Sequence, residues 1–482
     1  MFKKFFIGAL ALASMATSFG QSWTPLNHQP NFSAGVALLL TDGSVLVQNV
    51  GNRDWYRLIP DINGSYINGT WKPTTLAPAN FGPDYFASAV MDDGRVIAIG
   101  GEYNFGSAVW QTTGYVYDPI ADTWTFLPAP AGWPYVGDAQ CTVLPNGNFL
   151  LAQIIDNRIA VLDKHTYTWT NYAPTKNDRN DEEGWTLLPD GSILTCDAIA
   201  APKTERYIPF ASAWLQAGNT PQSLADPGSQ ELGPQVLMTN NKVLAIGATT
   251  HNAVYDVASG TWSAAPDFPN GLDEADGPAS LLPNGKVFCV ASPGVFNSGA
   301  HYFEYDPNTN TFTEVVGHPD APFQSSFFVD MLVLPNGQVL VTEQGSNVQI
   351  YTPAGGPQDA WRPTWTNPQN ALTAGQTYTF QGTQFNGLSQ CNAYGDDYSN
   401  ASNYPLVRLT NIATGAVKYA RTSGHSTMAV ATGSQIVSTN VTIPQQIAPG
   451  LTSVEIIANG IPSKKTNVII TNLLSKTPKN GT

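Results

Sequence analysis

The chain has 482 residues, of which 42% are hydrophobic and 12% charged, with a formal net charge of −14 and an isoelectric point near 4.7. Nucleic acids and anionic membranes need basic surface, so we expect neither as a partner. The chain also has 43 glycines, 36 prolines and 11% aromatic residues. Many turns combined with many aromatic residues predict an all-β protein.

Residues 1–20 have the pattern of a signal peptide. Lys3 and Lys4 precede the apolar stretch FFIGALALASMAT, and Ser18 and Gly20 supply small residues before a predicted mature start at Gln21. The apolar stretch is too short to span a bilayer, and no later segment reaches about 18 apolar residues. We therefore predict a secreted or periplasmic protein without a membrane span.

A hairpin pattern recurs seven times at intervals of roughly 50 residues. Each copy has an apolar stretch, a turn pair and a second, alternating stretch. The copies are ALLLTDGSVLV, SAVMDDGRVIAIGG, CTVLPNGNFLLA, WTLLPDGSILTC, VLMTNNKVLAIG, SLLPNGKVFCV and LVLPNGQVLVT. A second strand pair follows most copies, as in YVYDPIADTWTFL. Four strands in each of seven repeats predict a seven-bladed β-propeller over residues 21–356.

Aromatic residues recur in the last strand of the repeats, where we expect them to pack between blades. They are Trp71, Trp124, Trp169, Trp214, Trp262 and Phe312. The segment SWTPL around Trp23 has the same appearance but precedes the first hairpin. We predict that it joins the seventh blade and closes the ring, which removes exposed sheet edges.

The repeat stops near residue 356, and a Gly/Pro-rich linker follows. Residues 357–474 then contain alternating segments such as TAGQTYTFQGTQF and TSVEIIANG, which predict a small immunoglobulin-like β-sandwich. The polar residues 475–482 are predicted to form a flexible tail. Four widely spaced cysteines form neither a zinc motif nor a dense disulfide framework, so we expect small buried side chains, with one disulfide left open.

These repeats resemble those of secreted, galactose oxidase-like and glyoxal oxidase-like kelch proteins. The later segments PLVRL, GHSTM, NVTIP and APGLTSVEIIANGIPS resemble, in the same order, the early-set immunoglobulin-like domain that follows the propeller in that family. The resemblance implies that His425 enters the propeller pore, where the family has a copper-binding histidine. Two alternatives stay open for His425, a hydrogen-bonded residue in the domain interface or a contact with a ligand in the pore.

The resemblance fails at the other copper ligands. It implies a Tyr-His pair on an inner strand of a late blade, but Phe327 and Phe328 occupy those positions, and the chain contains no Tyr-His dipeptide. No cysteine matches the family's Tyr-Cys cross-link, Cys141 being the nearest. Phenyl rings cannot bind Cu(II). We therefore expect no cofactor, with copper or calcium as the metals left open.

Acidic residues recur just before the predicted innermost strands in five of the seven repeats. They are Asp84, Asp138, Glu183, Glu231 and Asp276. The innermost strands of a propeller surround its central channel, so these carboxylates are expected to form a negatively charged mouth that suits a glycan, another polar ligand or a hard cation. The alternative is that they are solvated loop residues or caps for backbone N–H groups.

Three functions are compatible with these patterns. The first is a secreted, non-catalytic or catalytically degenerate binding protein that recognises an extracellular glycan or other polar small molecule at the channel mouth, through the five carboxylates and His425. The second is a copper-dependent oxidoreductase related to galactose or glyoxal oxidase with an altered site. The third is a surface or assembly protein. The sequence leaves the oligomeric state open.

Overall fold

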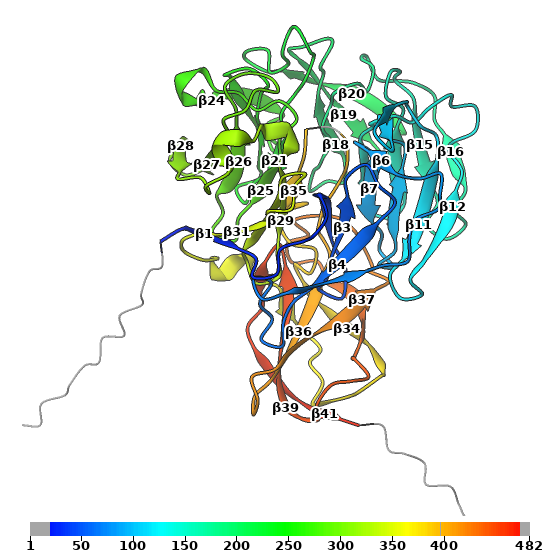
Figure 1. Ribbon diagram of the computed structural model, residues 1–482, viewed down its shortest axis with the longest axis vertical. Helices are drawn as coiled ribbons and strands as arrows, with labels where there is room; N and C mark the ends of the chain where they lie inside the picture. The colour runs from blue at the N-terminus through cyan, green and yellow to red at the C-terminus, as the bar shows by residue number, and fades with distance from the viewer. Residues whose placement is uncertain (1–19, 396, 473–482) are drawn as a thin grey trace, which may run out of the picture.

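A computed structural model describes residues 20–395 and 397–472 as two β domains (Figure 1). Residues 1–19 of the predicted signal peptide and the predicted tail at 475–482 lie outside the described residues. The fold class predicted from the sequence is confirmed, because seven small sheets form a propeller and a β-sandwich follows it. Within the described chain, no helix has the length and hydrophobicity needed to cross a membrane.

Each of the first four blades is an antiparallel sheet of four strands. Blade 1 contains β2 (Ala34–Leu39), β3 (Val45–Asn49), β4 (Trp55–Ile59) and β5 (Thr70–Pro73). Blade 2 contains β7 (Ala87–Val90), β8 (Val96–Ile99), β11 (Gly114–Asp118) and β12 (Thr123–Leu127). Beside it lies a ribbon of β6 (Pro83–Asp84), β9 (Tyr103–Asn104) and β10 (Ser107–Ala108). Blade 3 contains β13 (Cys141–Val143), β14 (Phe149–Ala152), β15 (Ile159–Leu162) and β16 (Trp169–Asn171). Blade 4 contains β17 (Thr186–Leu187), β18 (Ile193–Cys196), β19 (Lys203–Ile208) and β20 (Ala213–Asn219).

The last three blades complete the ring. Blade 5 contains β21 (Gln235–Leu237), β22 (Lys242–Ala245), β23 (Asn252–Asp256) and β24 (Thr261–Ala265). Blade 6 contains β25 (Ala279–Leu281), β26 (Val287–Ala291), β27 (His301–Asp306) and β28 (Thr311–Val315). Blade 7 contains β29 (Asp330–Val333), β30 (Val339–Thr342), β31 (Gln349–Thr352) and, from the other end of the chain, β1 (Ser22–Pro25). Trp23 lies opposite Tyr351 in the antiparallel β1–β31 pair, so the N-terminal strand closes the ring. The connections carry short 3₁₀ turns at Pro269–Gly271, Ala321–Phe323, Ser326–Phe328 and Asp359–Trp361.

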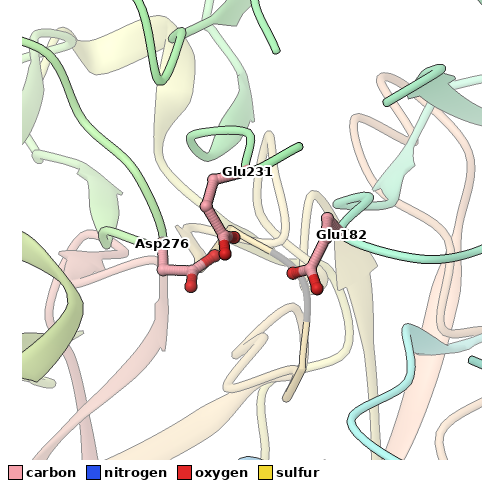
Figure 2. A group of neighbouring side chains, drawn as sticks. All are labelled: Glu182, Glu231 and Asp276. Carbon is pink, nitrogen blue, oxygen red and sulfur yellow. The ribbon is translucent and has the colours of Figure 1, made fainter. Parts of the chain in front are cut away.

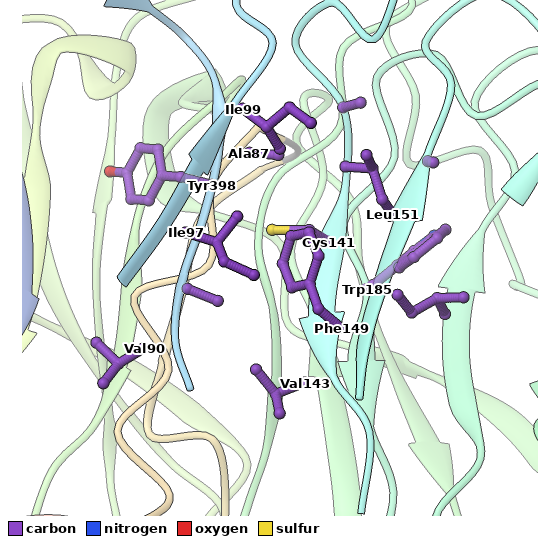
Figure 3. Packing of buried hydrophobic residues seen from close by; sticks show 14 of the residues in the cluster. Ala87, Val90, Ile97, Ile99, Cys141, Val143, Phe149, Leu151, Trp185 and Tyr398 are labelled. Atoms are coloured by element: carbon purple, nitrogen blue, oxygen red, sulfur yellow. The ribbon is translucent and has the colours of Figure 1, made fainter. Parts of the chain in front are cut away.

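Burial decreases from the inner to the outer strand of a blade. Every residue of the inner strand β7 is buried, whereas the outer strand β12 is exposed or half-buried except at its last residue. Inner strands touch neighbouring blades on both faces, so they are buried throughout, including polar residues such as Ser88 and Thr142. Figure 3 shows this packing between blades 2 and 3, where Ile97, Cys141 and Phe149 lie in one cluster. All four cysteines of the chain are buried and unpaired, as expected of small apolar side chains.

In several blades, the outer-strand tryptophan donates a hydrogen bond to the segment that follows the preceding blade. The Trp124 indole N–H donates to the Thr75 carbonyl oxygen at 3.0 Å, and the Trp169 indole does the same to Pro128 at 2.6 Å. Trp23, on the closing strand, donates to the carbonyl of Val316 at 2.8 Å. The predicted packing between blades is thus accompanied by hydrogen bonds, each of which stabilises the ring by about 1 kcal/mol.

The C-terminal domain is a sandwich built on a strand that changes partners. Its main strands are β32 (Thr364–Trp365), β33 (Ala371–Thr373), β34 (Thr377–Thr383), β36 (Leu406–Asn411), β37 (Val417–Ser423), β38 (Val437–Thr442), β39 (Gly450–Ala458), β40 (Ile461–Pro462) and β41 (Thr466–Thr471). The first half of β37 pairs with β36 and the second half with β38, so the sheet turns over a core that includes Phe380, Val441 and Ile456.

A segment of the C-terminal domain, residues 386–395 and 397–404, enters the centre of the propeller. Within it, β35 (Asn392–Ala393) pairs with the innermost strand of blade 6. The Asn392 side-chain oxygen accepts the backbone N–H of Val333 in blade 7 at 2.9 Å. Asn400 donates to the buried carboxylate of Asp330 at 2.9 Å, and Gln390 donates to the hydroxyl of Thr142 at 3.0 Å. We call this stretch the pore segment. Its hydrogen bonds attach it to several blades inside the channel, and the segment forms the floor of the site described next.

Candidate functional site

An open pocket of about 410 Å³ lies at the end of the propeller where the inner strands begin. Its lining combines carboxylates with aromatic rings. The lining residues are Tyr85, Glu102, Tyr103, Asp138, Glu182, Glu231, Asp276, Phe296, Phe327 and Asp397. Six of these ten residues are acidic, so the pocket has the negative potential that the sequence predicted for this end of the channel.

Three carboxylates from consecutive blades converge in the pocket, as Figure 2 shows. Glu182 precedes the inner strand of blade 4, Glu231 that of blade 5 and Asp276 that of blade 6. Each offers an oxygen atom that lies within 4.8 Å of the other two. We call these three residues the acidic triad. Their close approach makes the triad attractive to cations and to hydrogen-bond donors, and repels anions.

A left-handed backbone residue precedes the inner strand in five consecutive blades. The φ angles are 48° at Tyr85, 78° at Gly137, 59° at Glu182, 74° at Gln230 and 46° at Asp276. Only glycine adopts this conformation without steric cost, and such residues are often found at functional sites. At Glu182 and Asp276 the residue with this conformation itself lines the pocket.

Three of the five predicted carboxylates line the pocket: Asp138, Glu231 and Asp276. Asp84 instead lines a small adjoining cavity, where its Oδ1 accepts the backbone N–H of Gly51 at 2.7 Å. Burial raises the pKa of Asp84 to about 6, although the Gly51 hydrogen bond acts in the opposite direction. Asp84 therefore acts as a loop cap, which was the alternative considered for these residues.

The structure differs from the expectation at Glu183. This side chain is fully buried, and its Oε1 lies 2.8 Å from the Lys176 ammonium inside blade 4. Glu182 has a left-handed backbone with a φ of 59°, and this turn directs its side chain to the pocket while that of Glu183 points into the blade. The segment DEEG does reach the pocket as predicted, but the residue that lines the pocket is Glu182 and not Glu183.

Sequence reasoning missed Glu102, Glu182 and Asp397 as pocket residues. Glu102 follows the inner hairpin of blade 2 rather than preceding it, and Asp397 belongs to the pore segment. A signal for Asp397 was present in the polar, turn-rich stretch GDDYSN, which interrupts the strands of the C-terminal domain.

His425 lies in the interface between the domains and does not line the pocket. Its Nδ1 lies 2.9 Å from the Thr439 hydroxyl oxygen, and its backbone is next to the Asp92 carbonyl. Burial lowers the pKa of His425 to about 3, so the imidazole is neutral. His425 thus takes the first of its two alternatives, a hydrogen-bonded residue in the domain interface, and the pore segment lies in the channel instead.

The pocket does not offer the donors of a copper-radical site. Phe327 lines the pocket and Phe328 lines the small adjoining cavity, and no histidine is among the described lining residues of either. Burial raises the pKa of Tyr85, and the charge of Glu102 raises that of Tyr103, so both phenols keep their protons. Cu(II) prefers imidazole and deprotonated ligands, whereas an all-carboxylate set suits hard cations such as Ca²⁺.

Comparisons with known proteins agree with this architecture. A model of the kelch motif matches residues 85–130. The chain is 31% identical over 127 residues to the Kelch-like protein terF of Aspergillus terreus, which is 26% of this chain and 26% of that protein. The alignment with this curated relative thus spans about a quarter of its length.

Among solved structures, a fungal alcohol oxidase of the AA5 family in complex with copper superposes with a TM-score of 0.55. The match covers 93% of this chain and 99% of the oxidase, at 15% sequence identity. Likeness at this identity shows a shared fold. The protein therefore contains a kelch motif and shares the fold of this oxidase, and its pocket is lined by carboxylates and aromatic rings.

Proposed function

We propose that this protein is an extracellular binding protein that recognises a neutral or cationic glycan in the acidic pocket. The observation that supports this most strongly is the convergence of Glu182, Glu231 and Asp276 beside aromatic rings in one open pocket. Ligand sites combine apolar walls with a few placed polar groups. Carboxylates accept hydrogen bonds from sugar hydroxyls, and the faces of rings such as Phe296 contact the apolar faces of sugars.

The negative potential also determines which glycans are excluded. No lysine or arginine is among the described lining residues, so a sugar carboxylate or sulfate would enter without a cation to balance it. Bringing like charges together in a pocket costs several kcal/mol. Sugars with uronate or sulfate groups should therefore bind much more weakly than neutral sugars or amino sugars of the same size.

The test is a glycan screen followed by calorimetry on the mature protein. We expect binding of neutral or amino sugars, and a loss of affinity of about tenfold or more in Glu231→Gln and in Asp276→Asn, because each change removes a charged acceptor. Asp359→Asn, at an exposed site in the linker, removes the same charge and should bind like the wild type. Equal affinity in all three variants, or no binding of any glycan, would contradict the proposal.

The same samples should be analysed for metals by mass spectrometry after incubation with calcium or copper and desalting. Stoichiometric calcium that disappears in Glu231→Gln would mean that a cation occupies the acidic triad and takes part in glycan binding. Stoichiometric copper that disappears in His425→Ala would support the oxidoreductase alternative instead. The donor set described above favours the first outcome over the second.

A further inference from the structure

Next to the pocket, an aromatic surface is exposed on the β6–β9–β10 ribbon. Phe105, Val109 and Trp110 are 42%, 49% and 41% exposed. The Trp110 ring packs edge-on against Tyr135, with 5.3 Å between the ring centroids. Single exposed apolar residues are common, but adjacent ones beside a pocket mark an interaction surface. We call Trp110 and Tyr135, together with the ribbon that ends two residues before Trp110, the aromatic shelf.

The shelf is continuous with the wall of the pocket. Glu102, which lines the pocket, accepts the backbone N–H of Val109 through its carbonyl oxygen at 2.8 Å. Tyr103, also in the wall, lies edge-on to Tyr85 with 6.1 Å between centroids. On the other side, the loop of Tyr135 runs three residues further to Asp138 in the pocket. A ligand that leaves the pocket over blades 2 and 3 would therefore pass directly onto the shelf.

Backbone hydrogen bonds hold the shelf in place. The N–H of Phe105 donates to the Gly82 carbonyl at 2.7 Å, and that of Gln111 donates to Gly101 at 3.0 Å. The N–H of Val136 donates to the Gln111 carbonyl at 2.7 Å, which ties the Tyr135 loop to the ribbon. Binding surfaces gain affinity when their large side chains are already fixed, since little entropy is lost on binding.

We infer that the ligand is an oligosaccharide, with one sugar unit in the acidic pocket and the following units stacked on Trp110 and Tyr135. This inference rests on the proposed function and specifies the length of its ligand. Tryptophan and tyrosine offer a broad apolar face together with a polar edge, which suits a molecule that has both C–H faces and hydroxyl groups. Continuity with the carboxylate-lined pocket favours a glycan chain over an apolar protein partner.

The test is a chain-length series of the glycan identified in the screen, from one unit to five. In the wild type, affinity should rise at least tenfold as units are added beyond the first. Trp110→Ala and Tyr135→Ala should each remove most of that gain while leaving the affinity for the single unit unchanged. Phe210→Ala is the matched control, because Phe210 is 94% exposed on the outer edge of blade 4. Melting temperatures would identify any variant that fails to fold, and two independent shelf variants guard against that outcome.

Other results would overturn the inference. If the gain with chain length persists in both shelf variants, or if affinity does not depend on length, the shelf is not a sugar subsite, although carboxylate-dependent binding of the single unit would still support the proposed function. If no glycan binds at all, both proposals fail. If the wild type dimerises in analytical ultracentrifugation and Trp110→Ala abolishes the dimer, a second copy of the chain occupies the shelf.

Discussion

Glu182 and Glu183 are neighbours in the sequence but lie in opposite environments. Glu182 is half-buried at the open pocket, where its carboxylate meets those of two other blades. Glu183 is fully buried inside blade 4, where Lys176 lies 2.8 Å away and the carboxylates of Asp197 and Glu205 are also within 4 Å of the Lys176 ammonium. The buried group is an ion cluster enclosed by protein, whereas the other group lines an open pocket.

The difference shows that two groups of carboxylates in one propeller are balanced in different ways. The cluster around Lys176 is enclosed by protein, so its charges must balance one another. The acidic triad is at the solvent-accessible mouth, where water or a ligand can satisfy its oxygens. Mutations in the first group should therefore change folding, and mutations in the second should change binding.

The largest expected effect is that of Lys176→Met. This change leaves the carboxylates of Glu183, Asp197 and Glu205 buried without their cation, which should lower the free energy of unfolding by about 3–5 kcal/mol. The measurement is urea unfolding followed by circular dichroism. As a control, Lys242→Met removes a half-exposed pair with Asp256 and should cost less than about 1 kcal/mol. Equal losses in the two variants would show that the buried cluster is not a special source of stability.

The second effect is a fall in stability with rising pH. Burial raises the pKa of Glu183 to about 8 and that of Asp197 to about 7. Burial also acts to lower the pKa of Lys176, but the carboxylates around it outweigh that effect and keep the ammonium charged. The folded cluster therefore keeps protons that the unfolded chain has lost by about pH 5. The folded state binds more protons in this range, so its stability should decrease as pH rises from 5 to 8.

The measurement for this effect is the free energy of unfolding at pH 5, 6, 7 and 8. We expect a total decrease of about 2 kcal/mol or more, and a shallower slope in Glu183→Gln, because the amide does not titrate. Asp84 and Asp330, whose pKa values burial also raises, contribute to both proteins and cancel in the comparison. Identical slopes would rule out Glu183 as a titrating group in this range.

The sequence predicted the parts of the fold that repeat. Seven hairpins with similar turns, such as those at Gly147 and Gly285, reveal the blades because each copy has the same local pattern. Asp138, Glu231 and Asp276 could be found in the same way, since a residue at one position of each blade must face the channel. The sequence could not distinguish Glu182 from Glu183, because the residue that adopts the left-handed turn here is not a glycine and so has no local signal.

The pore segment was beyond sequence reasoning for a different reason. Asn392 and Asn400 make their hydrogen bonds to blades 6 and 7, from which they are separated by 59 or more residues. Such contacts have no local periodicity. The resemblance to oxidases placed His425 in the pore, but the structure fills it with a stretch that contributes Asp397 to the pocket. Family resemblance therefore predicted that the second domain would enter the channel and assigned the wrong residue to it.

The smallest expected effect on stability is that of Glu182→Gly, and its comparison with Glu183→Gly separates the roles of the two neighbouring glutamates. Glu182 has a φ of 59°, which glycine adopts without strain, and blade 3 has Gly137 at the corresponding position. Glu182→Gly should relieve about 1 kcal/mol of backbone strain, offset by the greater flexibility of glycine in the unfolded chain. We therefore expect a free energy of unfolding within about 1 kcal/mol of the wild type, and weaker glycan binding, since one acceptor of the triad is lost.

Glu183→Gly, one residue further, removes the buried partner of Lys176 and should cost several kcal/mol. A loss of more than about 2 kcal/mol in Glu182→Gly would mean that the Glu182 side chain holds the fold together, and the separation between the stabilising and the binding carboxylates would not hold.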